Sequence, residues 1–418
     1  MIEVGGMVRV MATGEEGTVT MTNGHAHKVC GRWHLTEELA KRCNAGCVAV
    51  CESMSVSEAS RKAADECWAK GIAEFRAGMQ SSSPGKGLAL FQESLELDSS
   101  DADRYYFVGV LLVMHNLPRE AIRCWEAAIS LNPQDEYPYL ELVMLYEGAH
   151  KHEEARSVAA RAIRAGARWS DEWQYCPQFT PGLTAKPWWS PDEFPWTGQL
   201  EAAYEDIKAE LIDLLNAKGS NNLDMPPEWR SVGAHDGTGD DTIVAPGGSW
   251  REFRIYSAEL DEEPDPDIAK YLRKTCNLLE TLLPGAVSMA KLGVGEIIFS
   301  ALAPGTKLIP HCASNNVRLT CHLGMVCPDG ARIRVGPTWG SWQEGKCTFF
   351  DDSFEHEIVH DGDRMRVVLL IRFWHPELPM ERWIATLEEG METFERLGAK
   401  RMTPPENPAV SQLLAELG

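Results

Sequence analysis

The sequence has no long apolar run and no recognisable leader. None of its 418 residues lies in a stretch approaching 18 uninterrupted apolar residues, the length that a membrane-spanning helix needs. Residues 1–10 carry no basic segment followed by an apolar run, so a secretory signal is not expected there. These absences predict a cytoplasmic protein without a membrane span.

Positive charge is also in short supply. The chain has 40 Lys and Arg against 62 Asp and Glu, a formal net charge of −22. Nucleic acids and anionic membranes bind positive patches, so we expect no nucleic-acid partner. A composition of 44% hydrophobic and 24% charged residues is typical of a globular protein, and the length favours two or three domains.

Cysteines are present but scattered. Twelve of them over this length indicate reduced, mostly buried thiols and not a disulfide framework. Cys43, Cys47 and Cys51 share one face of a helix because they are spaced by four. One straight helix rarely supplies three metal ligands, so packing is favoured over a metal site.

The N-terminal part of the chain divides into two regions. Residues 1–35 contain short β runs around the Asn23-Gly24 turn and predict a small β-barrel-like module. A 34-residue repeat follows, in which Phe91 recurs as Trp125 and Leu97 as Leu131. Residues 36–168 are therefore expected to be helical and are similar to tetratricopeptide repeats, which stack helix pairs. Such an array offers either a protein-binding surface or a packing platform.

The middle of the chain changes character several times. Residues 169–196 are dense in Trp and Pro and predict an ordered irregular connector. A helix is expected at about 199–217, a surface loop at 221–248 and a strand at 249–256. A further helix is expected at about 267–283, ended by Pro284-Gly285.

After Gly295 the hydrophobic period becomes two. The expected strands are 296–302, 306–309, 317–326, 332–335, 346–350, 357–359 and 365–373. Many short strands without intervening helices favour a double-sheet jelly roll, within a domain of residues 169–385. Residues 386–418 form a predicted C-terminal helical tail, and the fold class is α+β with several domains.

Histidines in these strands suit an iron site. Non-haem Fe(II) oxygenases bind iron through two histidines and a carboxylate, as His-x-Asp/Glu and a distant His. His311 and His356 match best, although Ala313 occupies the carboxylate position. His322 competes as a ligand, and the spacing alone leaves both choices open. Arg366, ten residues after His356, would suit a dicarboxylate such as 2-oxoglutarate.

An ordered set of motifs then carries a family resemblance. Its members are Pro304-Gly305-Thr306, Pro310-His311, Asn316-x-Arg318-Leu319, His322-Leu323-Gly324, Gly345-Lys346, the run from Phe350 to Glu357, and Trp374-His375-Pro376-Glu377-Leu378. Together they resemble the aspartyl/asparaginyl β-hydroxylase family, from about residue 188 to residue 378. The resemblance implies a double-stranded β-helix that uses Fe(II) and 2-oxoglutarate, with iron bound by two histidines only.

The resemblance also implies roles for individual residues. Its implied iron ligands are His311 and His356. It implies 2-oxoglutarate contacts at Trp250, Ser300, Thr320, His322 and Arg366, and an acid beside the metal at Asp352. The chain departs from the family at two of these motifs. Ala313 stands where the family has glycine. Thr320 stands where an arginine is expected, which weakens 2-oxoglutarate binding or shifts the role to Arg318 or Arg332.

These observations predict a dioxygenase that hydroxylates a protein or peptide side chain, with Asp or Asn favoured by the resemblance. The helical repeats joined to the barrel favour a protein substrate. The alternative is a non-catalytic scaffold that binds partners through its helical repeats.

Overall fold

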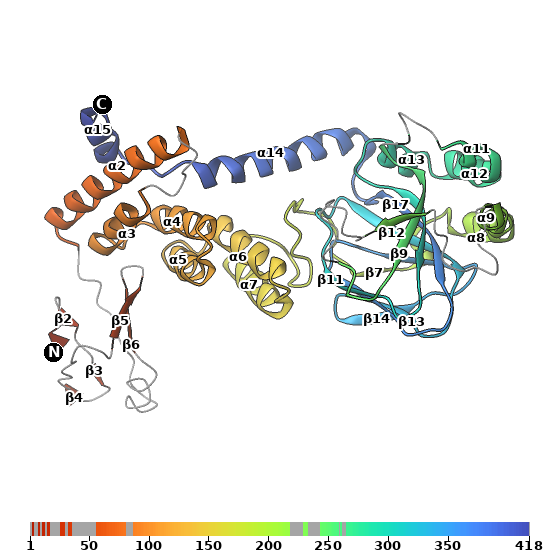
Figure 1. Ribbon diagram of the computed structural model, residues 1–418, viewed down its shortest axis with the longest axis horizontal. Coiled ribbons are helices and arrows are strands. Elements are labelled where there is room, and N and C mark those ends of the chain that lie inside the picture. Colours follow the sequence, from red (N-terminus) through yellow and green to blue (C-terminus); the bar gives the residue numbers. More distant parts are fainter. Residues whose placement is uncertain are drawn as a thin grey trace. The chain divides into compact units, whose positions relative to one another are not determined.

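The computed structural model describes residues 56–80, 87–217, 229–232, 243–258, 260 and 265–417, with short paired strands between Ile2 and Leu35 (Figure 1). Contacts divide the chain into two compact units, Met1–Leu142 with Arg396–Gly418, and Val143–Glu395. The division falls inside a helix of the repeat region, so the last repeat helix belongs to the second unit. The domain boundaries drawn from the sequence stay predictions.

The N-terminal strands form three antiparallel pairs. They are β1 (Ile2–Glu3) with β2 (Met7–Val8), β3 (Met11–Ala12) with β4 (Glu15–Glu16), and β5 (Ala26–Val29) with β6 (Arg32–Leu35). The barrel-like module stays a prediction. Cys43, Cys47 and Cys51 lie outside the described residues.

Successive helices follow the predicted repeat. They are α2 (Glu58–Gln80), α3 (Leu88–Leu97), α4 (Ala102–Met114), α5 (Pro118–Leu131), α6 (Glu136–Gly148) and α7 (His152–Ala165). The first residues of α4 and α6, 102 and 136, are 34 apart, as are those of α5 and α7, 118 and 152. The period is therefore present in the helices, while their assignment to tetratricopeptide repeats stays a prediction.

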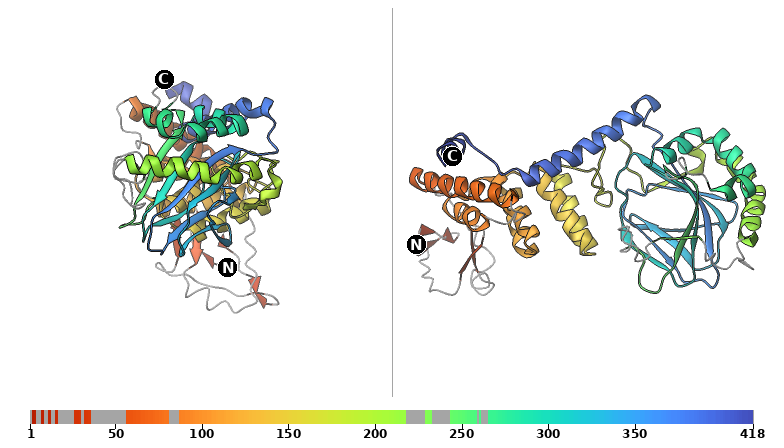
Figure 2. Two further views of the ribbon diagram at one scale, coloured as in Figure 1. Left: turned by 90° about the vertical axis from the view of Figure 1, so that its right-hand side faces the viewer. Right: turned by 45° about the horizontal axis from the view of Figure 1, so that its top comes forward.

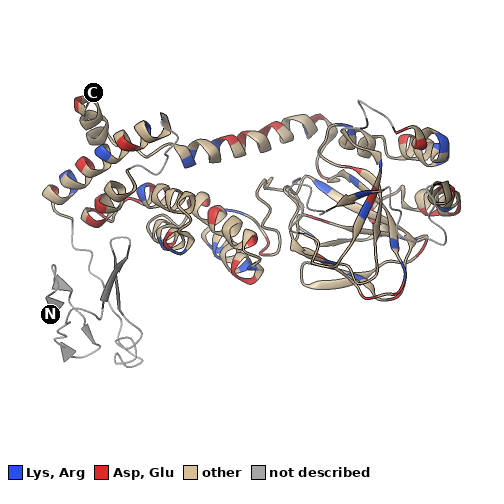
Figure 3. Ribbon diagram, in the orientation of Figure 1, with Lys and Arg blue, Asp and Glu red and all other residues tan. Residues whose placement is uncertain are grey.

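The first unit has an aromatic core. Trp68, Phe91 and Phe107 are fully buried, with ring centroids 4.5 to 6.1 Å apart. The C-terminal residues join this unit, because α15 (Pro408–Leu417) packs on α2. Basic residues at the end of α14 (Trp383–Met402), coloured blue on the ribbon in Figure 3, pair with acids of this unit: Lys400 with Asp103 and Arg401 with Glu141.

Two antiparallel sheets form the second unit. Among the described residues one sheet has the order β7-β15-β12-β17-β10-β9-β8 and the other β11-β16-β13-β14. The strands of the large sheet are β7 (Trp188–Trp189), β8 (Arg230–Val232), β9 (Trp250–Tyr256), β10 (Ile297–Leu302), β12 (Arg318–Val326), β15 (Cys347–Phe350) and β17 (Arg366–Trp374). Those of the small sheet are β11 (Lys307–His311), β13 (Ala331–Val335), β14 (Thr338–Ser341) and β16 (His356–His360).

The large sheet has two different faces. Alternate side chains such as Leu319, Leu369 and Ile371 face outward and share one core with the helices. These helices are α8 (Thr197–Ala202), α9 (Tyr204–Ala217), α11 (Pro266–Tyr271), α12 (Arg273–Leu282) and α13 (Pro284–Lys291), and Figure 2 shows the helices against the sheet. The inner face packs on the small sheet, for example Val368 with Ile333. The functional residues come from this inner face.

The predicted strands after residue 295 are confirmed, and two assignments need correction. The strands β7, β8 and β14 were not predicted, and β8 lies within the segment expected to be a loop. The expected helix at 267–283 is two helices that meet at Leu272. The second of them ends at Leu282, before Pro284 as expected, and Pro284 occupies the first turn of the next helix, α13, where a missing N–H costs nothing.

Within the described part of the chain, no helix combines the length and the apolar character needed to cross a membrane.

Candidate active site

His311 and His356 lie side by side at the ends of β11 and β16. They are register partners, and a bulge between Leu308 and His311 brings them opposite each other. Their ring centroids are 4.2 Å apart. Each Nδ1 lies 2.8 to 2.9 Å from a backbone carbonyl, of Ile309 and Phe354 respectively. A carbonyl only accepts, so each Nδ1 donates and each Nε2 keeps its lone pair.

This pair has the properties of a metal site. Burial, and then the proximity of His356, lowers the pKa of His311 to about 3, and burial also lowers the pKa of His356. Both rings are therefore neutral near pH 7, the form that binds metals. Backbone carbonyls fix the ring tautomers, as is usual for metal-binding histidines. No group of three or more potential ligands from His, Cys, Asp and Glu occurs among the described residues, so the donor set is two imidazoles.

Asp352 lies beside this pair, between two arginines. Its Oδ2 is 3.3 Å from Arg318 Nη2 and 3.3 Å from Arg372 Nε. Burial alone would raise the pKa of Asp352, but the charges of Arg318 and Arg372 lower it below its usual value. The carboxylate is thus ionised at neutral pH. Its Oδ1 is buried and has no hydrogen-bond partner among the described residues.

Arg366 lies deeper on the inner face of β17. Its side chain is 1% exposed, and no carboxylate pairs with it in the described part of the chain. Its guanidinium carbon is 4.8 Å from the ring centroid of Trp342, and Nη1 is 3.4 Å from the Ser300 carbonyl. Burial lowers the pKa of Arg366 to about 9, so it remains a cation at neutral pH. Buried cations without a counter-ion are costly, which indicates that an anionic ligand belongs here.

Three more predicted residues surround Arg366. Trp250 Nε1 donates to Ser300 Oγ over 3.1 Å, which links β9 to β10. Trp342 Nε1 donates to His322 Nδ1 over 3.0 Å, so the neutral ring of His322 carries its proton on Nε2. That Nε2 is buried and without a partner in the described structure. An N–H donor and a guanidinium on one wall form an anion-binding arrangement.

Thr320 lies on the same wall, between Arg318 and His322 along β12. Its register partners are Phe350 on β15 and Arg372 on β17. Arg332, one of the two alternatives for the arginine role, points elsewhere: its side chain is 55% exposed and pairs with Asp361 at 3.6 Å. Arg318 stays near the site through Asp352. The other histidines of this region, His360 and His375, contact backbone carbonyls of Arg364 and Thr184.

Comparison with known proteins agrees with this arrangement. Residues 201–376 match the model of the family described as aspartyl/asparaginyl beta-hydroxylase. The match includes the strands of both sheets except β7. The human aspartyl/asparaginyl beta-hydroxylase is 34% identical over 216 residues, covering 50% of this chain and 26% of that protein. Aspartate beta-hydroxylase domain-containing protein 2 of Mus musculus is 30% identical over 204 residues, covering 48% of this chain and 54% of that protein. The chain thus spans from about a quarter to about half of the length of these relatives.

Beyond the predicted residues, the hydroxylase domain contains a buried ion network next to His356. Glu355 is fully buried and accepts from Tyr175 Oη at 2.7 Å, Arg156 Nη1 at 2.6 Å and Arg334 Nη2 at 2.7 Å. These bonds link α7, the Trp- and Pro-rich connector and β13 to Glu355, which directly precedes the metal-ligand candidate His356. Sequence reasoning missed this network and also Trp342, because neither has a motif or a period of its own.

A cavity of about 500 Å³ adjoins this network. It lies between α7 and the small sheet, and its lining includes Pro310, the residue before His311, together with Trp173, Arg156 and Arg334. The guanidinium carbons of Arg156 and Arg334 are 4.2 and 5.2 Å from the ring centroid of Trp173. Arg334 and Glu357 alternate along β13 and β16 with the inward-facing Ile333 and Ile358, so this aromatic and cationic recess lies on the outer face of the small sheet.

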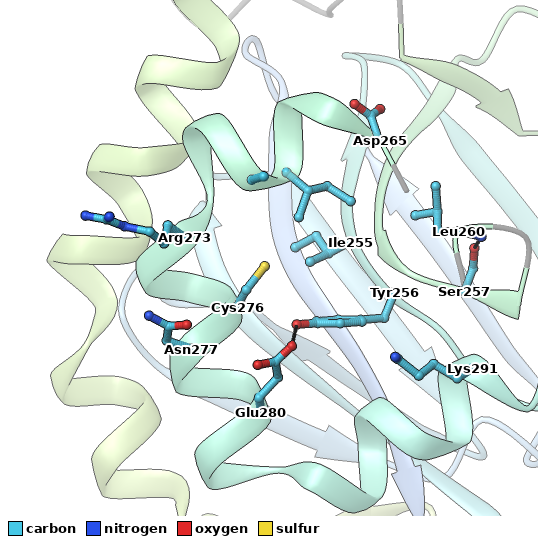
Figure 4. A pocket seen from close by; sticks show the side chains of 12 residues that line it. Ile255, Tyr256, Ser257, Leu260, Asp265, Arg273, Cys276, Asn277, Glu280 and Lys291 are labelled. Carbon is cyan, nitrogen blue, oxygen red and sulfur yellow. Dashed lines mark hydrogen bonds between the residues drawn. The ribbon is translucent and has the colours of Figure 1, made fainter. Parts of the chain in front are cut away.

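A second cavity of about 380 Å³ lies on the outer, helical side of the domain. Figure 4 shows Tyr256 on β9 donating to Glu280 on α12 over 2.8 Å, with Cys276 nearby. Its lining contains none of the residues of the inner wall. The candidate active site is therefore confined to the inner face.

Proposed function

We propose that this chain is an Fe(II)- and 2-oxoglutarate-dependent dioxygenase that hydroxylates an Asp or Asn side chain of a protein or peptide. The proposal includes the double-stranded β-helix fold for the hydroxylase domain. The observation that carries it is the combination of two neutral imidazoles with free Nε2 positions, at the ends of small-sheet strands, and a buried guanidinium without a carboxylate on the inner face of the large sheet.

Each of these residues has a separate proposed role. His311 and His356 would hold Fe(II) through Nε2, leaving the remaining metal positions for oxygen donors. Arg366 would pair with the carboxylate of 2-oxoglutarate far from the metal, with Ser300 and Trp250 beside it, and His322 would donate its Nε2–H to the co-substrate. When bound, Fe(II) would let O₂ oxidise both 2-oxoglutarate and substrate, so that 2-oxoglutarate becomes succinate and CO₂, one oxygen atom of O₂ enters succinate and the other enters a C–H bond of the substrate. Asp352 would accept a hydrogen bond at Oδ1 and so orient a water or substrate donor.

The recess beside Pro310 supports a polypeptide substrate. The recess lies on the outer face of the small sheet, and its lining includes Pro310 and Glu355, the residues directly before His311 and His356, so a bound polypeptide would pass next to the strand ends that carry the histidine pair. Its aromatic ring and guanidinium groups suit backbone carbonyls and acidic or amide side chains. The names of the matched relatives refer to aspartyl and asparaginyl residues, which favours these side chains as the substrate class.

Succinate formation tests the proposal. Purified protein with Fe(II), 2-oxoglutarate and air is expected to produce succinate, first by uncoupled turnover and faster with substrate peptides. His311→Ala is expected to abolish both this production and Mn(II) binding, because one of two protein ligands is lost. His375→Ala is the matched control, since the ring of His375 contacts the Thr184 carbonyl, the Glu377 N–H and the Trp189 ring and not the residues proposed to bind metal or co-substrate. Equal succinate from His311→Ala and from the wild type would refute the metal assignment.

Thr320 gives the scaffold alternative one supporting observation, because an expected co-substrate arginine is missing. Calorimetry with Mn(II) in place of iron separates the two functions. Heat of 2-oxoglutarate binding that depends on Arg366 supports the enzyme. Absence of 2-oxoglutarate binding at millimolar concentration supports the scaffold.

A further inference from the structure

A second arginine shares the inner wall with Arg366. Side chains of a strand alternate between faces, so Arg366 and Arg372, six residues apart on β17, point to the same side of the sheet. Arg372 is the direct register partner of Thr320 on β12. Directly opposed residues of antiparallel strands have Cβ atoms about 5 Å apart. The guanidinium absent at position 320 is therefore present on the neighbouring strand.

This arginine lies on the metal side of the wall. Thr320 is flanked by Arg372 on one side and by Phe350 on the other. The Phe350 ring is 6.0 Å from the His356 ring and 5.0 Å from the His322 ring. Arg366 lies six residues further along β17, paired in register with Leu302. The two guanidinium groups thus stand at the metal end and at the far end of the same wall.

The neighbours of Arg372 keep it in this position. Nη1 pairs with Glu296 at 2.9 Å, and Nε lies 3.3 Å from Asp352 Oδ2. Thr320 Oγ1, directly beside Arg372, is buried and has no hydrogen-bond partner in the described structure.

We propose that Arg372, with Thr320 beside it, binds the metal-proximal carboxylate of 2-oxoglutarate, while Arg366 binds the far carboxylate. The inference rests on the proposed function and deepens it. 2-Oxoglutarate is a dianion with a carboxylate at each end, and the wall offers one cation for each end. In this chain position 320 on β12 holds the small Thr320 side chain, and the positive charge is on its register partner Arg372 on β17.

Calorimetric titration of 2-oxoglutarate into the Mn(II)-loaded full chain tests this assignment without turnover. Arg372→Ala is expected to weaken 2-oxoglutarate binding roughly tenfold to a hundredfold, with Mn(II) affinity unchanged. Arg372→Lys keeps the charge and loses the planar fork, so a smaller loss is expected; it also serves if Arg372→Ala does not fold. The double variant Thr320→Arg/Arg372→Ala returns a guanidinium to the wall and is expected to recover most of the affinity.

Two further variants separate binding from positioning. Asp352→Asn removes the ion pair but keeps Arg372, so it is expected to lose less 2-oxoglutarate affinity than Arg372→Ala. Arg332→Ala, on the exposed side of the small sheet, is the matched arginine control and is expected to bind like the wild type. A loss in Asp352→Asn equal to that in Arg372→Ala would overturn the assignment, because Arg372 would then act only by holding Asp352.

Wild-type 2-oxoglutarate affinity in Arg372→Ala would also overturn it. Failure of the wild type itself to bind 2-oxoglutarate is a different result, because it removes the proposed function and not only this residue.

Discussion

Two arginines of the hydroxylase domain, Arg334 and Arg366, meet their surroundings in opposite ways. Arg334 on the small sheet pairs with Glu355 and Glu357 and packs over Trp173. Arg366 on the large sheet packs over Trp342 but pairs with no carboxylate in the described structure. Burial would lower the pKa of both; the acids raise that of Arg334, whereas that of Arg366 stays lowered. The charge of Arg334 is thus balanced by carboxylates of the protein, whereas the charge of Arg366 has no counter-charge in the described structure.

Removing Arg334, the paired arginine, tests whether it stabilises the fold, and this substitution has the largest expected effect on stability. Arg334→Met leaves Glu355 fully buried with fewer donors, so the free energy of unfolding should fall by about 3 kcal/mol. Urea denaturation followed by tryptophan fluorescence measures it. An unchanged denaturation midpoint would show that Arg156 and Tyr175 satisfy Glu355 without Arg334.

Replacing Arg366, which has no carboxylate partner, should affect ligand binding and not stability. Arg366→Met keeps most of the side-chain volume and removes a buried charge, so stability without ligand should be equal to or above that of the wild type. Affinity for 2-oxoglutarate should fall roughly tenfold to a hundredfold, since one guanidinium–carboxylate contact is lost. Thermal denaturation and calorimetry measure the two quantities on the same sample. Strong destabilisation by Arg366→Met would show that this arginine stabilises the fold, as Arg334 is expected to do.

Neutralising Glu355 tests the same ion pair through the carboxylate partner of Arg334. Glu355→Gln keeps the shape and an acceptor oxygen but leaves Arg156 and Arg334 facing an uncharged group. The free energy of unfolding is expected to fall by about 1 to 2 kcal/mol. Because Glu355 precedes His356, the Mn(II) affinity of the variant should be measured as well. Loss of metal affinity without loss of stability would assign the network to the site and not to folding.

The smallest effect is expected at the exposed arginine. Arg332 pairs with Asp361 at 3.6 Å, and both side chains are more than half exposed. Arg332→Met should change the free energy of unfolding by less than about 0.5 kcal/mol, because solvent screens such a pair. The same urea titration applies. A change as large as that of Arg334→Met would show that surface position is a poor guide in this domain.

The sequence indicated the strands of the inner wall because residues 317–326 and 365–373 alternate regularly. The histidine and arginine candidates on them followed from spacing and resemblance. Register was out of reach, since which residue of β17 faces Thr320 depends on how distant strands align. The opposition of Arg372 to Thr320 therefore became visible only in the structure.

The remaining omissions have a similar physical cause. Glu355 is held by Arg156 and Tyr175, 199 and 180 residues away in the sequence. Trp342 follows β14, a short strand whose exposure pattern lacks alternation. Pro284 was interpreted as the end of a helix, although proline is equally suited to the first turn of the next one.

The bulge in β11 sets a limit on how this domain tolerates changes in length. Three residue steps from Leu308 to His311 face only two from Ile358 to His356. Deleting Ile309 or Pro310 would restore a regular ladder with two steps on each strand, and the imidazole would still lie opposite His356 and on the face of Leu308. A single-residue deletion here should therefore leave a folded protein that keeps its metal, whereas deleting both residues would turn the imidazole to the opposite face and abolish metal binding.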